Sequence, residues 1–330
     1  MEIDGNQYEG DLYDGVTTWY KDTAGNFYWS GGIDAKDAIP TEPSSSDFWF
    51  EKLDIGHIWS MYEEQGDRCN VLILDTGIND NLNVFKDALN QAPLNFVASS
   101  KTTKSIDKLR HGTHCAGLIA SRPIDFEVGI APQSKLIVGK INEHGWLKDA
   151  ASINAALTEF LKAEYDNKID LISISQSLGL SDNTMEELIK KHIAKNRVVV
   201  TAIGNDGFKE NLNTKKYPGF YEVPISVGSC ESDNSLSNYT CFPSAVDVFC
   251  YGTNIKSYTE ENYPIPLSGT SQATAIVSGI CALIISALKK KNQPISCDSI
   301  KNLLKSTAAP LKTNNQYKLI QPKAIFESIF

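Results

Sequence analysis

Three short segments of the chain carry an acid, a base and a nucleophile in settings that suit catalysis. Asp75 ends the apolar run 71–74, His111 opens a stretch of small residues, and Ser271 precedes the apolar segment 273–288. A serine hydroxyl is a weak nucleophile unless an imidazole takes its proton, and that imidazole needs a carboxylate on its other nitrogen. Together, the three side chains could therefore perform nucleophilic hydrolysis.

Each segment taken alone also has an ordinary structural explanation. Asp-Thr-Gly is typical of a turn after a strand, and a serine before a helix is a common N-cap. A lone histidine is most often a satisfied surface or core residue. The combination is more specific, because two of the five histidines, His111 and His114, lie within four residues. The order Asp, His, Ser is one in which catalytic triads occur, and we expect His114 to be structural.

The elements that must position these side chains alternate along the chain. Apolar runs predict strands over 71–74, 135–140, 169–174, 198–200 and 223–227, and helical spacing predicts helices over 153–165 and 185–196. This alternation is typical of an α/β fold with a doubly wound, mostly parallel sheet flanked by helices. In such sheets ligands bind at the carboxyl ends of the strands. The segment 273–288 predicts a buried core helix, and 297–330 predicts a helix, a loop and a short closing helix.

The first 46 residues differ from the rest. They are rich in glycine, aspartate and aromatic residues, with a hairpin turn indicated at 24–26 and a linker at 40–46. At about 150 residues per domain the length suggests two domains, but one large α/β domain fits equally well. We expect a small β-rich appendage over 1–46 and a catalytic domain over 47–330. The appendage could be a structural piece, a degenerate SH3-like module, or a binding or inhibitory segment.

The composition excludes several classes of function. With 31 basic and 40 acidic side chains the formal charge is −9, which argues against nucleic acid or an anionic membrane as partner. The seven cysteines contain no C-x-x-C pair, which indicates free thiols rather than disulfides or a zinc site. The first residues are acidic and turn-rich and show no secretion signal. We therefore expect a cytoplasmic protein.

From about Phe48 to its end, the chain resembles the subtilisin-like serine peptidases, the subtilase family (peptidase S8). The resemblance rests on three motifs, 75–77, 111–114 and 269–271. It extends to three further segments. Residues 202–207 are similar to the family's oxyanion-hole segment, 177–179 to its substrate-binding strand edge, and 217–219 to the wall of its S1 pocket.

The resemblance implies a role for each matched residue. Ser271 would be the nucleophile, His111 the general base and then the acid, and Asp75 the group that orients His111. Asn205 would donate a side-chain hydrogen bond to the oxyanion, beside the backbone N–H of Ser271.

Substrate contacts follow from the same resemblance. The substrate backbone would pair, as an added strand, with Ser177, Leu178 and Gly179. The site would also be lined by Ala202, Ile203 and Gly204. Lys216 would lie at the floor of the S1 pocket, where an ammonium would favour an acidic P1 side chain. Two alternatives stay open. Asp206 could pair with Lys216 and cancel that preference, or Lys216 could be a solvated loop charge.

The resulting prediction is a serine endopeptidase that acts on peptide or protein substrates, with neither nucleic acid nor membrane as partner. It could be a specialised processing protease, with the appendage as an autoinhibitory or partner-docking segment. The alternative is a catalytically silent pseudopeptidase that binds peptides in the same groove. Calcium is common in the family, but no loop of the D-x-[DN]-x-[DN]-G type is present, so no metal ligand is assigned.

Overall fold

The computed structural model describes residues 48–97, 107–122, 129–143, 150–162, 169–207, 213–259 and 264–330, and the backbone of three strands near the N-terminus. The chain divides into two compact units, Met1–Phe48 and Trp49–Phe330. In the first unit, strands β1 (Ile3–Tyr13), β2 (Val16–Asp22) and β3 (Phe27–Trp29) form an antiparallel sheet. β2 and β3 pair as the expected hairpin requires. The turn predicted at 24–26 and the linker at 40–46 lie outside the described residues.

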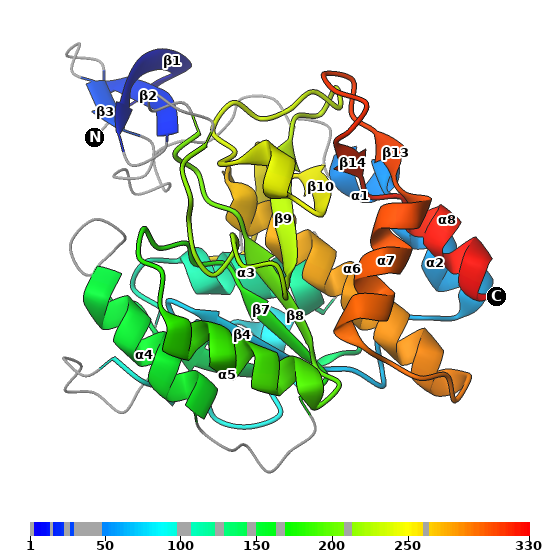
Figure 1. The fold of residues 1–330 in the computed structure, drawn as a ribbon. Coiled ribbons are helices and arrows are strands. Elements are labelled where there is room, and N and C mark those ends of the chain that lie inside the picture. The colour runs from blue at the N-terminus through cyan, green and yellow to red at the C-terminus, as the bar shows by residue number, and fades with distance from the viewer. Residues whose placement is uncertain are drawn as a thin grey trace. The chain divides into compact units, whose positions relative to one another are not determined.

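One nine-stranded sheet forms the centre of the second unit (Figure 1). Its order is β13-β14-β10-β9-β8-β7-β4-β6-β5, and every neighbouring pair is parallel except β13 with β14. The strands are β4 (Asn70–Asp75), β5 (Leu94–Asn95), β6 (Lys135–Lys140), β7 (Leu171–Ile174), β8 (Val198–Ala202), β9 (Ile225–Cys230), β10 (Val248–Tyr251), β13 (Ala309–Pro310) and β14 (Lys318–Leu319). A separate antiparallel pair joins β11 (Ile255–Ser257) and β12 (Ile265–Leu267).

Helices cover both faces of this sheet, as the strand and helix alternation predicts. In Figure 1, α4 and α5 lie in front of the sheet, and α3 and α6 lie behind it. The helices are α1 (Phe48–Lys52), α2 (Ile55–Tyr62), α3 (His111–Ala120), α4 (Ala150–Lys162), α5 (Asn183–Ala194), α6 (Thr270–Lys290), α7 (Cys297–Thr307) and α8 (Pro322–Ile329), with short 3₁₀ turns at Asn83–Phe85 and Pro243–Ala245. The predicted α/β class is confirmed. The start of α4, the ends of α5 and the start of β9 each differ from the expected positions by two or three residues. The helix end expected at 163–165 lies outside the described residues.

Helix α6 is the central helix of the second unit. Of the described residues, it alone forms a helix long and apolar enough to cross a membrane, but 94% of its most apolar stretch is buried inside the protein. It packs on β7, β8, β9 and β10. Its apolar character on all sides is therefore that of a core helix, as the sequence predicts. A side chain at its N-terminal end is held on a rigid support.

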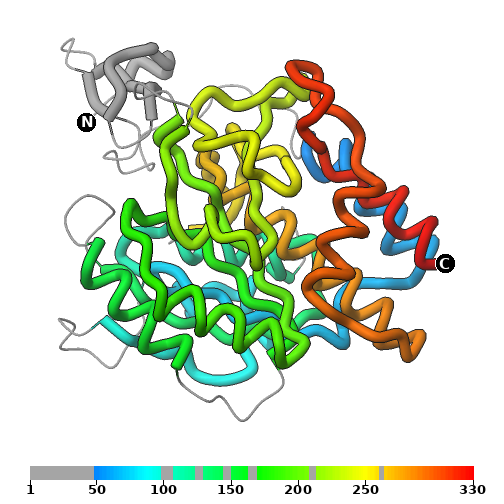
Figure 2. Tube along the Cα trace, viewed as in Figure 1, coloured from blue at the N-terminus to red at the C-terminus, as the bar shows by residue number. Residues whose placement is uncertain are grey.

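The beginning and the end of the second unit pack together. Figure 2 shows α2, in blue, beside the C-terminal helix α8, in red. The ring of Tyr62 lies 5.4 Å from that of Phe326 and 4.8 Å from that of Phe330, measured between centroids. The tail contains the two predicted helices, and the loop between them adds the short strands β13 and β14 to the edge of the sheet.

A glycine permits the close approach of α3 to the end of β4. A Cβ atom on Gly112 would lie 2.2 Å from the backbone oxygen of Gly77 and 3.1 Å from the Cβ of Asp75. No real Cβ contact is that short, so only glycine allows the first turn of α3 to touch the residues after β4.

We predict that Gly112→Ala destabilises the fold by about 1–3 kcal/mol, because the added methyl group must push α3 away from β4. Thermal or urea unfolding measures the loss. Gly56→Ala is the matched control, since Gly56 is exposed in α2 and a Cβ there would meet nothing within 4 Å. Equal stability of the Gly112→Ala variant and wild type would contradict the close packing.

Candidate functional site

The carboxyl ends of the parallel strands bring the candidate residues to one edge of the sheet. Asp75 is the last residue of β4, which lies between β6 and β7. In the register of the sheet, Asp75 lies opposite Lys140, and Leu74 lies opposite Ile174. The segments that follow β6 and β7 therefore emerge on either side of Asp75.

The carboxylate of Asp75 is fully buried and receives three hydrogen bonds on one oxygen. Its Oδ1 accepts from the backbone N–H of Thr76 at 2.7 Å, from Nδ1 of His111 at 2.7 Å and from Nε2 of Gln176 at 3.3 Å. Within the described residues its Oδ2 has no hydrogen-bond partner. A buried charge is tolerated when donors surround it, and Oδ1 is where these donors gather.

His111 begins α3, and a second buried carboxylate holds that start in place. Asp107 Oδ2 accepts from the backbone N–H of Thr113 at 2.7 Å and from its hydroxyl at 2.7 Å. Thr76 donates its hydroxyl to Asp107 Oδ1 at 2.7 Å, and the same hydroxyl oxygen accepts from the N–H of Gly112 at 2.8 Å. The turn after Asp75 and the first turn of α3 are thus locked together, and the ring of His111 meets Asp75.

Sequence reasoning missed Asp107 and Thr76. The signal that could have found Asp107 is its place shortly before a helix start, where carboxylates cap free N–H groups.

Electrostatics at His111 set two effects against each other. Burial disfavours the imidazolium and would lower its pKa, but the negative charge and the hydrogen bond of Asp75 raise the pKa above the ordinary value of 6.5. Cys115 lies one turn along α3, with its Sγ 3.9 Å from Nδ1 of His111. Burial raises the pKa of that thiol, so it remains a small neutral side chain.

His114 has a structural role, as expected. It is fully buried, and its Nε2 donates to the backbone oxygens of Ile255 at 3.0 Å and Ile265 at 3.1 Å. Burial is the main reason that its pKa falls to about 3, and the neighbouring His111 adds to the effect. His114 therefore stays neutral and ties α3 to the β11–β12 pair.

Ser271 is the second residue of α6 and is almost fully buried, with 7% of its surface exposed. Its Oγ donates to the backbone oxygen of Ser175 at 3.1 Å, and Oγ of Ser175 donates to the backbone oxygen of Ser271 at 3.2 Å. Ser175 is followed by Gln176, which reaches Asp75. Two consecutive residues after β7 thus connect the serine to the Asp75–His111 pair. The serine hydroxyl donates to Ser175, so its hydrogen must turn towards His111 before any attack.

Asn205 lies beside the start of α6 with its amide orientation fixed. Its Oδ1 accepts from the N–H of Thr270 at 2.8 Å and from the Thr270 hydroxyl at 2.8 Å. Its Nδ2 faces Gly269, where a Cβ would lie 3.0 Å from that nitrogen. The N–H groups at the start of α6 have no partner within the helix, so this place favours negative charge.

The other predicted residues lie in two segments, one partly exposed and one buried. Leu178 and Tyr217 exchange two backbone hydrogen bonds of 2.7 Å, which leaves Ser177 partly exposed and Gly179 exposed. The second segment consists of Ala202, Ile203 and Gly204, which are all buried.

The backbone at Gly219 packs closely against the backbone at Ala202. A Cβ on Gly219 would lie 2.1 Å from the backbone oxygen of Ala202. The segments 177–179, 202–204 and 217–219 thus meet in the structure.

Comparisons with known proteins agree on one family. The model of the subtilase family, Peptidase_S8, matches residues 66–321, which include every candidate site residue. The chain belongs to the subtilase family. Together with its subtilisin relatives, this membership makes it a serine endopeptidase.

Its relatives are distant. It is 29% identical to subtilisin BL of Lederbergia lenta over 255 residues, 76% of this chain and 87% of that protein. It is also 29% identical to M-protease of Shouchella clausii, of which the match covers 62%, less than two thirds. The structure matches a protease from Pseudoalteromonas arctica with a TM-score of 0.72 and 20% identity, over 88% of this chain and 99% of that one.

Lys216 of this subtilase forms an ion pair with Asp206. Their side chains are 20% and 31% exposed, so the pair is partly shielded from water. The stem of Lys216 lies over Gly204, where a Cβ would come within 2.7 Å of its Cγ. Of the three interpretations of Lys216, the pairing with Asp206 is the one that the geometry favours.

The described part of this subtilase offers one cluster of acidic, imidazole and thiol side chains that could hold a metal ion. Within those ranges, the one group of three or more His, Cys, Asp or Glu side chains with close ligand atoms is Asp75, His111 and Cys115. Nitrogen and thiol ligands do not suit calcium, which prefers oxygen. This group is the buried acid–base pair with a neighbouring thiol, and we derive no step through a metal.

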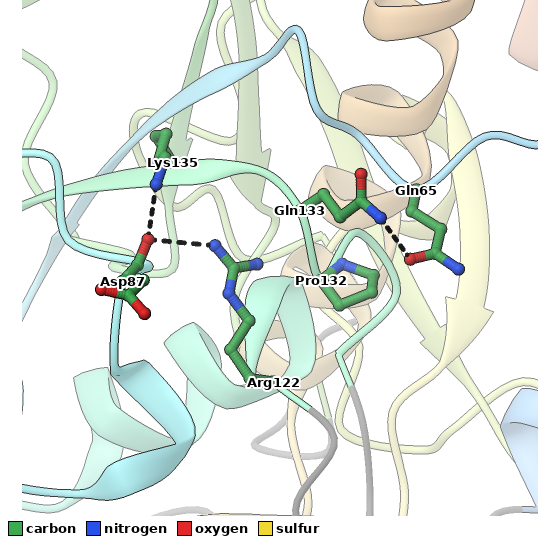
Figure 3. A pocket seen from close by; sticks show the side chains of 6 residues that line it. All are labelled: Gln65, Asp87, Arg122, Pro132, Gln133 and Lys135. Atoms are coloured by element: carbon green, nitrogen blue, oxygen red, sulfur yellow. Dashed lines mark hydrogen bonds between the residues drawn. The ribbon is translucent and has the colours of Figure 1, made fainter.

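A hollow in the second unit lies near the starts of β4 and β6, at the opposite end of these strands from Asp75. It is lined by Gln65, Asp87, Arg122, Pro132, Gln133 and Lys135 (Figure 3). Arg122 and Lys135 both donate to the backbone oxygen of Asp87, at 3.3 and 2.6 Å. Lys135 lies opposite Asn70, at the start of β4 rather than its end. The hollow therefore takes no part in the chemistry of the site.

We predict that His111 titrates above pH 6.5 and that Asp75→Asn moves its pKa below that value. The substitution removes the negative charge that stabilises the imidazolium but keeps the burial that opposes it. NMR titration of the ring measures both values. Asp233→Asn, which removes an exposed carboxylate of a loop, is the control and should leave His111 unchanged. A wild-type pKa below 6.5 would show that the pair does not form in solution.

Proposed function

We propose that this subtilase cleaves peptide bonds with Ser271 as nucleophile, His111 as general base and acid, and Asp75 as the group that orients His111. The observation that carries the proposal is the 2.7 Å hydrogen bond from Nδ1 of His111 to the buried Asp75. A histidine held in this way has its tautomer fixed, so its Nε2 is the nitrogen available to accept a proton.

In the first step, the hydroxyl of Ser271 turns from Ser175 towards His111 and attacks the carbonyl carbon of the substrate. His111 takes the hydroxyl proton, and Asp75 stabilises the imidazolium without accepting the proton itself. The carbonyl oxygen becomes an oxyanion. The amide Nδ2 of Asn205 and the backbone N–H of Ser271 donate to it, and the positive end of the α6 dipole adds to the stabilisation.

In the second step, His111 returns the proton to the leaving amine, and the C–N bond breaks to give an acyl-enzyme on Ser271. Water then attacks the ester carbonyl. His111 accepts a proton from that water and gives it back to the Ser271 oxygen as the acid product leaves.

Two segments bind the substrate. The exposed backbone of Ser177 and Gly179 pairs with the substrate as an added strand, which supplies affinity with little choice of sequence. The P1 side chain enters beside 202–204 and meets the ion pair of Lys216 and Asp206. Because the two charges neutralise each other, we infer that wild type has no strong preference for either sign of charge at P1.

Ser271→Ala should abolish cleavage, by about 10⁶-fold, since no other group supplies the nucleophile. Asn205→Ala should lower kcat by about 10²–10³-fold, because one oxyanion donor is lost. Incubation with a peptide library, read by mass spectrometry, gives both values. Ser306→Ala and Asn302→Ala, at exposed positions of α7, are the controls. A folded wild type that cleaves no peptide would instead identify a pseudopeptidase that only binds.

The ion pair predicts a specificity that can be switched in either direction. Asp206→Asn leaves Lys216 unpaired and should raise cleavage after Asp or Glu by about tenfold or more. Lys216→Met removes the ammonium beside Asp206 and should favour Lys or Arg at P1 by a similar factor. The double variant should prefer neutral side chains. The same library measures all three, and unchanged P1 profiles would show that the pair does not face the P1 side chain.

A further inference from the structure

Two buried amide side chains flank Asp75, and the proposed reaction gives neither a role. Gln176 has none of its surface exposed, and Asn142 has 1% exposed. Gln176 lies two residues beyond Ile174, the end of β7, and Asn142 lies two residues beyond the end of β6. Since β4 lies between these strands, the sheet delivers one amide from each side to the end of β4.

The hydrogen bonds of the two amides define a chain that ends on Asp75. Asn142 donates its Nδ2 to Oε1 of Gln176 at 3.3 Å, and Gln176 donates its Nε2 to Oδ1 of Asp75 at 3.3 Å. An ionised carboxylate only accepts hydrogen bonds, so the NH₂ group of Gln176 must face it. Its oxygen then faces Asn142, whose NH₂ group prevents the amide from flipping.

We propose that Gln176 is a positioning residue of the triad, oriented by Asn142, which holds the carboxylate of Asp75 at the angle at which it receives His111. This inference rests on the proposed function. Gln176 supplies one of the three donors to Oδ1, and Thr76 and His111 supply the others. Thr76 donates from the backbone, and the ring of His111 gains and loses a positive charge during the reaction. Gln176 is therefore the side-chain donor to Oδ1 that stays neutral throughout, and it restrains the carboxylate.

Gln176 also links the acid to the nucleophile. The backbone oxygen of the preceding residue, Ser175, holds the hydroxyl of Ser271 at 3.1 Å. The segment after β7 therefore contacts Ser271 through one residue and Asp75 through the next. A change at Gln176 is transmitted to the alignment of the triad, whereas the exposed substrate-binding residues 177 and 179 retain their positions.

Gln176→Met tests the inference, because methionine has a similar length and no donor. We expect kcat to fall about tenfold, as for one lost hydrogen bond to a charged group, with KM changed less than about twofold. With one donor fewer, Asp75 attracts the proton of His111 more strongly, so the acid limb of the kcat/KM profile should move to higher pH. Among the described residues, the other titratable groups that interact with this pair are Cys115 and His114 on α3, and the variant leaves both in place.

Gln133→Met is the matched control. Gln133 is exposed, pairs with Gln65 at 2.9 Å and lies at the opposite edge of the sheet. The same substitution there should change neither kcat nor the pH profile.

Asn142→Ala is the second variant, which leaves Gln176 and Asp75 in place and serves if Gln176→Met does not fold. It should shift the acid limb in the same direction by a smaller amount. In the double variant with Gln176→Met it should add less than about twofold, since Asn142 acts through Gln176. NMR titration of His111 gives the same ranking without relying on turnover.

Four outcomes would overturn the inference. In an active wild type, an unchanged kcat and pH profile for Gln176→Met would do so. An effect on KM alone, or full additivity of the two variants, would show instead that the amides shape the substrate groove or the core. A folded wild type without peptidase activity would overturn the proposed function itself, and this inference with it.

Discussion

A buried carboxylate at the end of β4 is the group on which the rest of the site depends. Taking an unpaired carboxylate out of water costs many kcal/mol, so Asp75 is tolerated only because donors converge on it. Its Oδ1 accepts from the backbone, from an imidazole and from an amide. The same bonds that satisfy the charge also fix His111. Stability and catalytic geometry are therefore consequences of one interaction.

The fold supplies this convergence through the direction of its strands. β7, β4 and β6 are parallel neighbours, so the segments that follow them meet at one edge. Helices α3 and α6 both begin at this edge, and each presents the residue that the chemistry needs in its first turn. The glycine at 112 lets α3 touch the end of β4, and Asp107 accepts from the N–H of Thr113 in the first turn of α3. Each of these contacts is local, and the parallel order of the strands brings the contacting segments together.

Much of this arrangement could be predicted from the sequence. The alternation of apolar runs and helical spacing predicted the α/β sheet, and the apolar stretch 273–288 predicted a core helix, because both patterns reflect burial directly. The motifs around Asp75, His111 and Ser271 indicated the candidate site because their residue types are rare in that combination. Helix and strand ends were off by two or three residues, since capping and sheet register, which periodicity does not encode, decide them.

The supporting residues were beyond sequence reasoning. Gln176 and Asn142 are ordinary polar residues after strands, and only the strand order brings them to Asp75. The state of Lys216 was left open because its partner depended on the path of the loop between 206 and 216. The hydroxyl of Ser271 is turned to Ser175, a rotamer that no motif specifies. In each case the sequence does not show which distant backbone segment lies next to the residue in the folded chain.

The most direct test of the central claim is labelling of the folded protein with a fluorophosphonate, followed by peptide mapping of the adduct. If Asp75 holds His111 ready to activate the serine, wild type should carry one adduct per chain, on Ser271. The folded Ser271→Ala variant should carry none, and Asp75→Asn should react far more slowly. A folded wild type that stays unlabelled, or an adduct on Ser175 in place of Ser271, would contradict the account.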